Sequence, residues 1–246
     1  MGNYEIVEYI ENTIPCVINT DIYPTERTHF EIKLDCGDFK KKDAYSSRAI
    51  LHKFSMGSYD FSEGRKMMRL SAPGDFTLCV DSPDDWQWGS HISCRWIDSK
   101  PDTFIKHFPH VVKFGDGYVH DITSQYEGLR ITVPDMDYKL NIKAPFGLFG
   151  IMEYRGEHLP LGCVLPDGSV YRIHYFKVYE DDGKDSDDMP LIAHMIPVKD
   201  SSGTLCMYDL VRERFFYPMD GSGRRVNLGG ENNAKSSSFF SKLFKR

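Results

Sequence analysis

The stretch Tyr171–Pro218, which reads YRIHYFKVYEDDGKDSDDMPLIAHMIPVKDSSGTLCMYDLVRERFFYP, decides the fold class of this chain. Four apolar runs lie in it, and an acidic loop and a Ser-Ser-Gly turn separate the first three. Short apolar runs bounded by turn residues are typical of strands in an antiparallel sheet. We therefore expect consecutive antiparallel strands at Tyr171–Tyr179, Leu191–Val198, Leu205–Leu210 and Phe215–Tyr217.

The chain upstream repeats this strand pattern. Phe30, Ile32 and Leu34 alternate with charged residues, which is the period of a half-buried strand. Gly115-Asp116-Gly117 joins two further apolar runs and predicts a tight hairpin, because glycine accepts positive φ. No window before residue 230 repeats apolar residues with the helical period. We therefore predict an all-β chain, a two-sheet antiparallel sandwich or jelly roll.

The composition changes at residue 229. We divide the chain into one β domain (1–228), a flexible polar linker (229–238, GGENNAKSSS) and a short basic amphipathic tail (239–246, FFSKLFKR). So short a helix is marginal in water, so we expect the tail to become ordered on a partner. A frayed terminus and a foot on a membrane surface are the alternatives. The docking residues would be Phe239, Phe240, Leu243 and Phe244.

The overall composition narrows the class of protein. Hydrophobic residues make up 41% and charged residues 27% of 246 residues, which is enough for a folded core. The net charge of −6 disfavours nucleic acid as the main partner. No apolar window is long enough to span a bilayer, and residues 1–11 lack the features of a secretory signal. We expect a protein without membrane spans, made in the cytoplasm.

The cysteines do not form a metal-binding or disulfide pattern. None of them pairs as Cys-x-x-Cys, and free cysteine behaves as a small apolar residue. We expect buried, reduced thiols and no cofactor. The cysteines are Cys16, Cys36, Cys79, Cys94, Cys163 and Cys206.

The best candidate for a ligand-binding stretch is Asp84, Asp85, Trp86 and Trp88. Indole rings stack on the apolar faces of sugars, and neighbouring carboxylates accept hydrogen bonds from hydroxyl groups. This stretch predicts a glycan or protein contact. The alternative is that Trp86 or Trp88 fills the core.

The densest acidic segment is a candidate calcium loop. Ca²⁺ prefers several carboxylate and carbonyl oxygens on one shaped loop, although a solvated loop explains the same composition. We keep calcium as a possible ligand and expect no other metal. The acidic residues are Glu180, Asp181, Asp182, Asp185, Asp187 and Asp188.

Two stretches resemble one family of modules. Val7–Pro24 (VEYIENTIPCVINTDIYP) is similar to the opening of laminin-G-like, concanavalin A-like jelly rolls. Arg172–Gly223 is similar to their ending, chiefly in RIHYFKVY, IPV and YDLV, and Leu148-Phe149-Gly150 resembles the preceding strand. Such modules are frequent in tail and virion proteins of bacteriophages and in surface proteins of gut bacteria.

The resemblance implies a fold and a set of contacts. It implies two packed antiparallel sheets in which the first strand pairs near the last, and it implies that Asp209 bonds backbone or a turn. Arg212-Glu213-Arg214 stands where the family has an Asn-Gly turn.

It also implies a function. We expect a non-catalytic binding or structural module on a virion or extracellular surface, with glycan, virion or surface-assembly proteins as partners; it could form oligomers. The alternatives are a glycoside hydrolase or lyase on this fold, although the Glu-x-Asp-x-x-Glu strand of related glucanases is missing, and a scaffold that docks through its C-terminal peptide.

Replacing either indole tests the ligand-binding stretch. Trp86→Ala or Trp88→Ala should weaken glycan binding without changing the cooperative thermal unfolding, because an exposed ring contributes to binding and little to the core. Binding is measured on a glycan array and unfolding by circular dichroism. Loss of the cooperative transition in both variants would show that the rings belong to the core.

Overall fold

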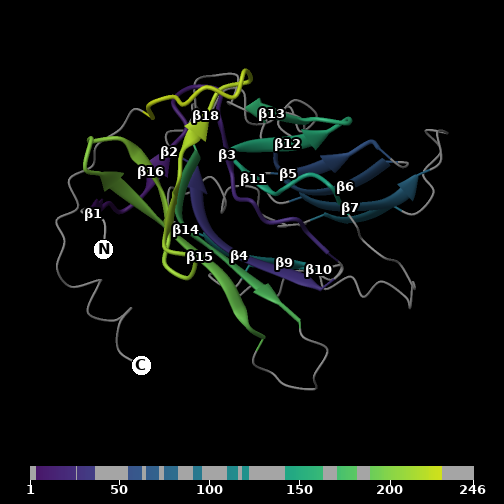
Figure 1. Cartoon of the computed structure of the whole chain (residues 1–246). Helices are drawn as coiled ribbons and strands as arrows, with labels where there is room; N and C mark the ends of the chain where they lie inside the picture. Colours follow the sequence, from purple (N-terminus) through teal and green to yellow (C-terminus); the bar gives the residue numbers. More distant parts are fainter. Residues whose placement is uncertain are drawn as a thin grey trace, which may run out of the picture.

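Every regular element in the described part of the chain is a β-strand, and the strands form two sheets (Figure 1). The structure is a computed structural model that describes residues 4–25, 27–36, 55–62, 65–71, 75–82, 91–95, 110–115, 118–121, 142–162, 171–181 and 189–228. The strands are β1 (Tyr4–Ile6), β2 (Ile10–Glu11), β3 (Val17–Asn19), β4 (Thr28–Cys36), β5 (Ser55–Asp60), β6 (Arg65–Ser71), β7 (Asp75–Ser82), β8 (His91–Arg95), β9 (His110–Gly115), β10 (Tyr118–Asp121), β11 (Gly147–Leu148), β12 (Gly150–Tyr154), β13 (His158–Gly162), β14 (Tyr171–Glu180), β15 (Leu191–Asp200), β16 (Leu205–Asp209), β17 (Arg214–Phe216) and β18 (Pro218–Met219).

The strands are divided between sheet A and sheet B. Sheet A has the order β10-β9-β4-β14-β15-β16-β17, with β1 beside β15 and β2 beside β14. Sheet B has the order β18-β3-β11-β5-β6-β7-β8, with β12 between β5 and β13. The β12–β5 pairing is parallel, and the other described pairings are antiparallel. The four strands predicted in the opening stretch are therefore confirmed as neighbours β14 to β17.

An early strand, β3, and the last described strand, β18, meet in sheet B. β3 pairs with β18, so that Val17 lies opposite Met219 and Ile18 opposite Pro218. The chain reaches β18 directly from β17, which belongs to sheet A, and so crosses from one sheet to the other. The resemblance implies that the first strand pairs near the last. The first described strand, β1, instead pairs with β15 of sheet A, and it is the third strand, β3, that pairs with β18.

Alternation along the strands of sheet A explains which side chains face the core. In β4 the side chains of Phe30, Ile32 and Leu34 are buried in the main hydrophobic cluster. In β14 a bulge shifts the register between Ile173 and Tyr175. Because a shift of one residue moves later side chains to the opposite face, the bulge decides which residues of β14 point away from the core.

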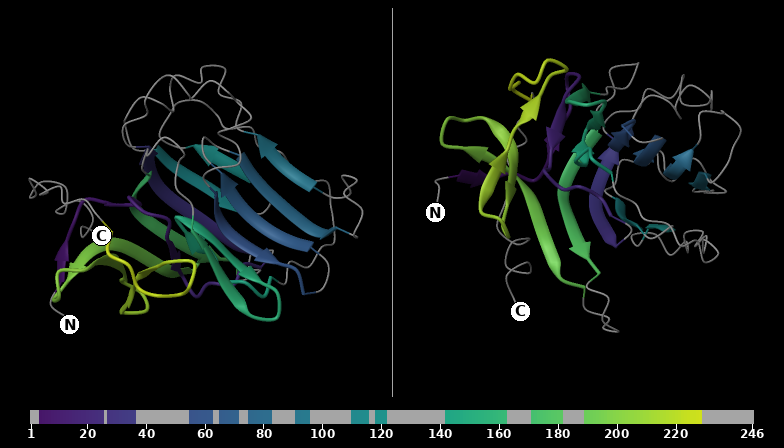
Figure 2. Two further views of the ribbon diagram at one scale, coloured as in Figure 1. Left: turned by 90° about the horizontal axis from the view of Figure 1, so that it is seen from above. Right: turned by 45° about the vertical axis from the view of Figure 1, so that its right-hand side comes forward.

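A stack of three phenylalanine rings joins the two sheets. Phe30 of β4 and Phe176 of β14 lie in sheet A, and Phe146 immediately precedes β11 of sheet B. Their ring centroids are 4.7 Å (Phe30–Phe146), 5.6 Å (Phe30–Phe176) and 5.5 Å (Phe146–Phe176) apart. Figure 2 shows the two layers from two further sides. One core between two layers is compatible with the expected β sandwich.

Two loops of the same sequence pattern, Asp-x-Ser-Gly, have the same geometry. They are Asp200–Gly203, between β15 and β16, and Asp220–Gly223, after β18. In each, the aspartate Oδ1 accepts a hydrogen bond of 2.8 Å from the serine amide two residues on. The final glycine has a φ of 83° in the first loop and 76° in the second, a region that suits glycine.

The described cysteine side chains behave as predicted. Cys16 and Cys206 are buried free thiols. Burial raises the pKa of Cys206 to about 12, so this thiol is protonated at neutral pH. Among the described residues, no helix has the length and apolar character needed to cross a bilayer.

Removing one ring of the stack tests its contribution. Phe146→Ala should lower the free energy of unfolding by about 3–5 kcal/mol, because a fully buried ring leaves a cavity between the sheets. Chemical denaturation measures this change. Tyr23→Ala, at a ring that is 47% exposed, should change stability by less than about 1 kcal/mol. Equal effects of the two substitutions would contradict the assignment of the stack as the contact that joins the sheets.

Candidate functional site

Most residues of the predicted sites lie outside the described part of the chain. Asp84, Asp85, Trp86 and Trp88 lie in the interval 83–90, and Phe239, Phe240, Leu243 and Phe244 lie in the interval 229–246. Asp182, Asp185, Asp187 and Asp188 of the acidic loop lie in the interval 182–188. The structure therefore does not test these predicted sites.

Glu180, the first residue of the acidic loop, is engaged in a structural contact. Its Oε1 accepts a hydrogen bond of 2.8 Å from the Thr25 hydroxyl, and its Oε2 accepts one of 2.9 Å from the Thr28 hydroxyl. The carboxylate therefore ties the end of β14 to the turn before β4. Among the described residues, no group of three or more His, Cys, Asp or Glu side chains could hold a metal ion.

The outer face of sheet A, which points away from sheet B, gathers aromatic and polar side chains from several strands. Strand register places these residues together. Lys177 lies opposite His194 on one side and Glu31 on the other, and Tyr208 lies opposite Ile196 and Phe215. Residues directly opposite each other in antiparallel strands share a face. This face has a polar part and an aromatic part.

The polar part is the Glu31 cluster, which consists of Glu31, Tyr175, Lys177, Tyr179 and His194. The Glu31 carboxylate accepts hydrogen bonds from the Tyr175 hydroxyl (3.0 Å) and from Lys177 Nζ (3.2 Å). Glu31 is only 7% exposed, so its charge needs these partners. Tyr175 and Lys177 lie two residues apart beyond the bulge in β14 and so share one face.

The protonation states of the cluster follow from burial and from the Glu31 charge. Burial, and then Glu31, raises the pKa of Tyr175 and raises the pKa of Tyr179 to about 12, so both phenols keep their protons. Burial, followed by the Lys177 charge, lowers the pKa of His194, which is therefore neutral at pH 7. Its Nε2 is buried and has no hydrogen-bond partner among the described residues. The cluster therefore offers neutral donors and acceptors beside an ion pair.

The aromatic part is the aromatic patch, which consists of Tyr4, Tyr208, Phe215 and Tyr217. Ring centroids are 4.5 Å apart for Tyr4–Tyr208, 4.8 Å for Tyr208–Phe215 and 6.1 Å for Phe215–Tyr217. The patch rests on Ile196, Val198 and Cys206, which form a second hydrophobic cluster.

Two charged residues border the patch at Tyr217. The Arg225 guanidinium lies 3.9 Å from the centroid of the ring. The Tyr217 hydroxyl donates a hydrogen bond of 2.9 Å to Asp200 Oδ2. Hydrogen bonds from Ser202, Thr204 and Tyr217 lower the pKa of Asp200 to about 2, so it is ionised at neutral pH. The patch thus combines ring faces with a cation and an anion at one edge.

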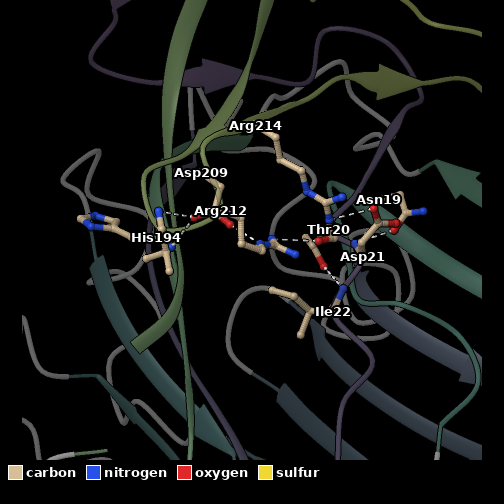
Figure 3. Close-up of polar contacts among 9 residues, drawn as sticks. Asn19, Thr20, Asp21, Ile22, His194, Asp209, Arg212 and Arg214 are labelled. Atoms are coloured by element: carbon tan, nitrogen blue, oxygen red, sulfur yellow. Dashed lines mark hydrogen bonds and ion pairs between the residues drawn. The ribbon is translucent and has the colours of Figure 1, made fainter. Parts of the chain in front are cut away.

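A buried carboxylate holds the two parts in place (Figure 3). Asp209 is 0% exposed, and its Oδ1 accepts hydrogen bonds from the amides of His194 (3.0 Å) and Val211 (2.9 Å). Its Oδ2 accepts a hydrogen bond from Arg212 Nε. The expectation that Asp209 bonds backbone or a turn is confirmed. Because the His194 ring belongs to the Glu31 cluster and β17 carries Phe215, Asp209 positions residues of both parts.

Arg212 of the β16–β17 turn and Arg214 of β17 connect sheet A to the segment after β3. Arg212 Nη2 donates a hydrogen bond of 3.0 Å to the Thr20 carbonyl, and Arg214 Nη2 donates one of 3.0 Å to Asp21 Oδ2. Figure 3 shows both arginines reaching toward Thr20 and Asp21. Between them, Glu213 has a φ of 54°, so a left-handed turn forms here without the glycine of the resembled family.

Comparison of the chain with protein-family models, with curated proteins and with solved structures finds no match. The interpretation of the outer face therefore rests on its own residues. Sequence reasoning placed the strands that carry this face but did not select it as a site. A usable signal was present, because Glu31 and Lys177 occupy the outward positions between buried residues of β4 and β14.

Asp209→Asn tests the buried carboxylate. Burial alone would raise the pKa of Asp209, but hydrogen bonds from His194, Arg212 and Val211 outweigh it and lower the pKa below its ordinary value of 3.8. The substitution should lower the free energy of unfolding by about 3 kcal/mol at pH 7. Since the folded-state pKa is depressed, this stabilisation is complete above pH 3.8 and is lost as the pH falls through the folded-state pKa.

Denaturation at several pH values measures both effects. The difference between the wild type and Asp209→Asn should shrink as the solution becomes more acidic. Asp21→Asn is the matched control, because the Asp21–Arg214 pair has side chains 44% and 47% exposed and should contribute less than about 1 kcal/mol. A pH-independent difference for Asp209→Asn would show that its charge is not what stabilises the turn.

Proposed function

We propose that this chain is a non-catalytic binding module that recognises a glycan or protein surface through the outer face of sheet A. The observation that supports this most is that the aromatic patch and the Glu31 cluster adjoin on one hydrogen-bonded sheet. Tyrosine rings present large contact areas and lose little conformational entropy on binding. Sites built on strands also hold their geometry better than sites built on loops.

The chemistry of the face suits hydroxyl-rich ligands. The partly exposed rings of Tyr4, Phe215 and Tyr217 would stack on the apolar faces of sugar rings. The ring of Tyr208 is buried and packs against Tyr4 and Phe215. Protonated phenols, a neutral histidine and a lysine–glutamate pair would exchange hydrogen bonds with hydroxyl groups. The same residue types, together with arginine, are enriched in protein–protein interfaces, so a protein partner fits this face as well.

The resemblance supports a setting for this activity. We infer a laminin-G-like jelly roll that serves as a virion or extracellular-surface component, with virion or surface-assembly proteins as partners. The stretch with Trp86 and Trp88 and the C-terminal peptide with Phe239 would provide further contacts in the same role. The scaffold alternative relies on that peptide alone.

A glycoside hydrolase or lyase is the second candidate. It is favoured by His194, whose neutral ring has a buried Nε2 without a described partner and so could accept a proton, beside the buried Glu31 carboxylate and the protonated Tyr175. Hydrolysis would further require a second carboxylate about 5–10 Å away across the scissile bond. Polysaccharide depolymerisation by the wild type, abolished in Glu31→Gln or His194→Asn, would replace the binding proposal with this one.

The binding proposal is tested with variants of each part of the face. Tyr217→Ala and Lys177→Ala should each weaken binding about tenfold, which corresponds to about 1.4 kcal/mol per contact. Binding is first measured on a glycan array and on host-cell surfaces. The affinity for a ligand identified in this way is then measured by titration calorimetry. Tyr23→Ala, an exposed aromatic away from this face, should bind as the wild type does. Wild-type affinity in both face variants would place the ligand elsewhere on the chain.

A further inference from the structure

The strands β14 and β15 of sheet A separate beyond Met195, and the N-terminal segment lies between them. We call the gap between these two strands the fork. β14 and β15 pair directly only from Phe176–Met195 to Tyr179–Leu191. Beyond Met195 the two strands have different neighbours, because β2 pairs with Arg172 and Ile173 of β14, and β1 pairs with Val198–Asp200 of β15. Figure 1 shows β1 and β2 entering beside these two strands. The segment 4–11, which we call the wedge, therefore lies between β14 and β15, and these two strands pair with each other only at one end.

The wedge covers both faces of the fork. Ile10 is 0% exposed in the core between the sheets, whereas Tyr4 and Ile6 pack on the second hydrophobic cluster of the outer face. The amide of Val7 donates a hydrogen bond of 3.1 Å to the Pro197 carbonyl. Without the wedge, the fork would present unpaired strand edges and uncovered apolar side chains, which are the two features that recruit another strand.

The link that follows the wedge is short and exposed. Thr13, Ile14 and Pro15 are exposed, and Ile14 is 37% exposed although it is apolar. On one side of this link the chain belongs to sheet A, and on the other side β3 belongs to sheet B. If the backbone of this link alone changed direction, the wedge of one molecule could enter the fork of another. The contacts between wedge and fork would be the same as within one molecule.

We propose that the fork is a strand-acceptor groove and that two copies of this chain assemble by exchanging their N-terminal segments. The partner is a second copy because its wedge carries Tyr4 and Ile6 for the outer cluster and Ile10 for the core, in the register that the fork already pairs. Exchange of an identical element replaces intramolecular contacts with the same contacts between copies, so its cost in free energy is small. Each dimer would carry two outer faces of sheet A.

The length of the link provides the first test. Deleting Ile14 and Pro15 shortens the reach of the link by about 7 Å, so the wedge should no longer reach its own fork. Size-exclusion chromatography with light scattering should then show a dimer with an unchanged circular dichroism spectrum. Inserting Gly-Ser-Gly after Ile14 is the control and should raise the monomer fraction of the full chain. A folded, monomeric deletion variant would overturn the proposal.

Complementation provides a second test that does not depend on the folding of the shortened chain. One chain carries a damaged wedge (Ile6→Asp with Ile10→Asp), and the other carries a damaged fork (Val198→Asp). Each should be insoluble when expressed alone. Co-expressed with different tags, they should yield a soluble complex at least tenfold above either alone, because one intact wedge can enter one intact fork. Two wedge-damaged chains are the control and should give none. Failure to recover the mixed complex would overturn the proposal, whatever the shortened chain does.

Discussion

The buried carboxylate of Asp209 is the contact on which the candidate site depends. It accepts hydrogen bonds from the amide of His194 on β15, from the amide of Val211 in the β16–β17 turn, and from Arg212, which continues to the Thr20 carbonyl. One charge thereby fixes two strands, a turn and the segment after β3. A buried charge of this kind is stabilising only while all its partners are present, so the β16–β17 hairpin behaves as one unit with the strands beside it.

Both faces of sheet A are used, for different purposes. The inner face carries Phe30 and Phe176 into the stack that joins the sheets, and the outer face carries the aromatic patch and the Glu31 cluster. The bulge between Ile173 and Tyr175 makes this division possible, since it moves Tyr175 to the outer face and leaves Phe176 in the core. A sheet that is pinned on its inner face is a rigid support for ligand contacts on its outer face.

Local patterns in the sequence predicted the strands, whereas pairing between distant strands could not be predicted. The alternation of Phe30, Ile32 and Leu34 predicted β4, and the four runs after Tyr171 predicted β14 to β17. The Glu31–Lys177 contact depends on the register between strands that are far apart in the chain, and no local pattern specifies it. The parallel β12–β5 pairing and the pairing of the wedge with β14 and β15 also join segments that are far apart in the chain, so no local pattern specifies them either. The second Asp-x-Ser-Gly loop, at Asp220, was a repeat that comparison with Asp200–Gly203 could have identified.

The fork has a consequence for synthesis of the chain on the ribosome. β1 and β2 leave the ribosome well before their partners β15 and β14, which end at Asp200 and Glu180. At about 5–20 residues per second, the N-terminal segment waits roughly 10–40 s before its groove exists. During this interval Ile6 and Ile10 lack the strands with which they pair, so the segment is open to a chaperone or to the groove of a neighbouring nascent chain. Insertion of the N-terminal segment into sheet A is therefore a late step of folding, because it must follow the translation of β15.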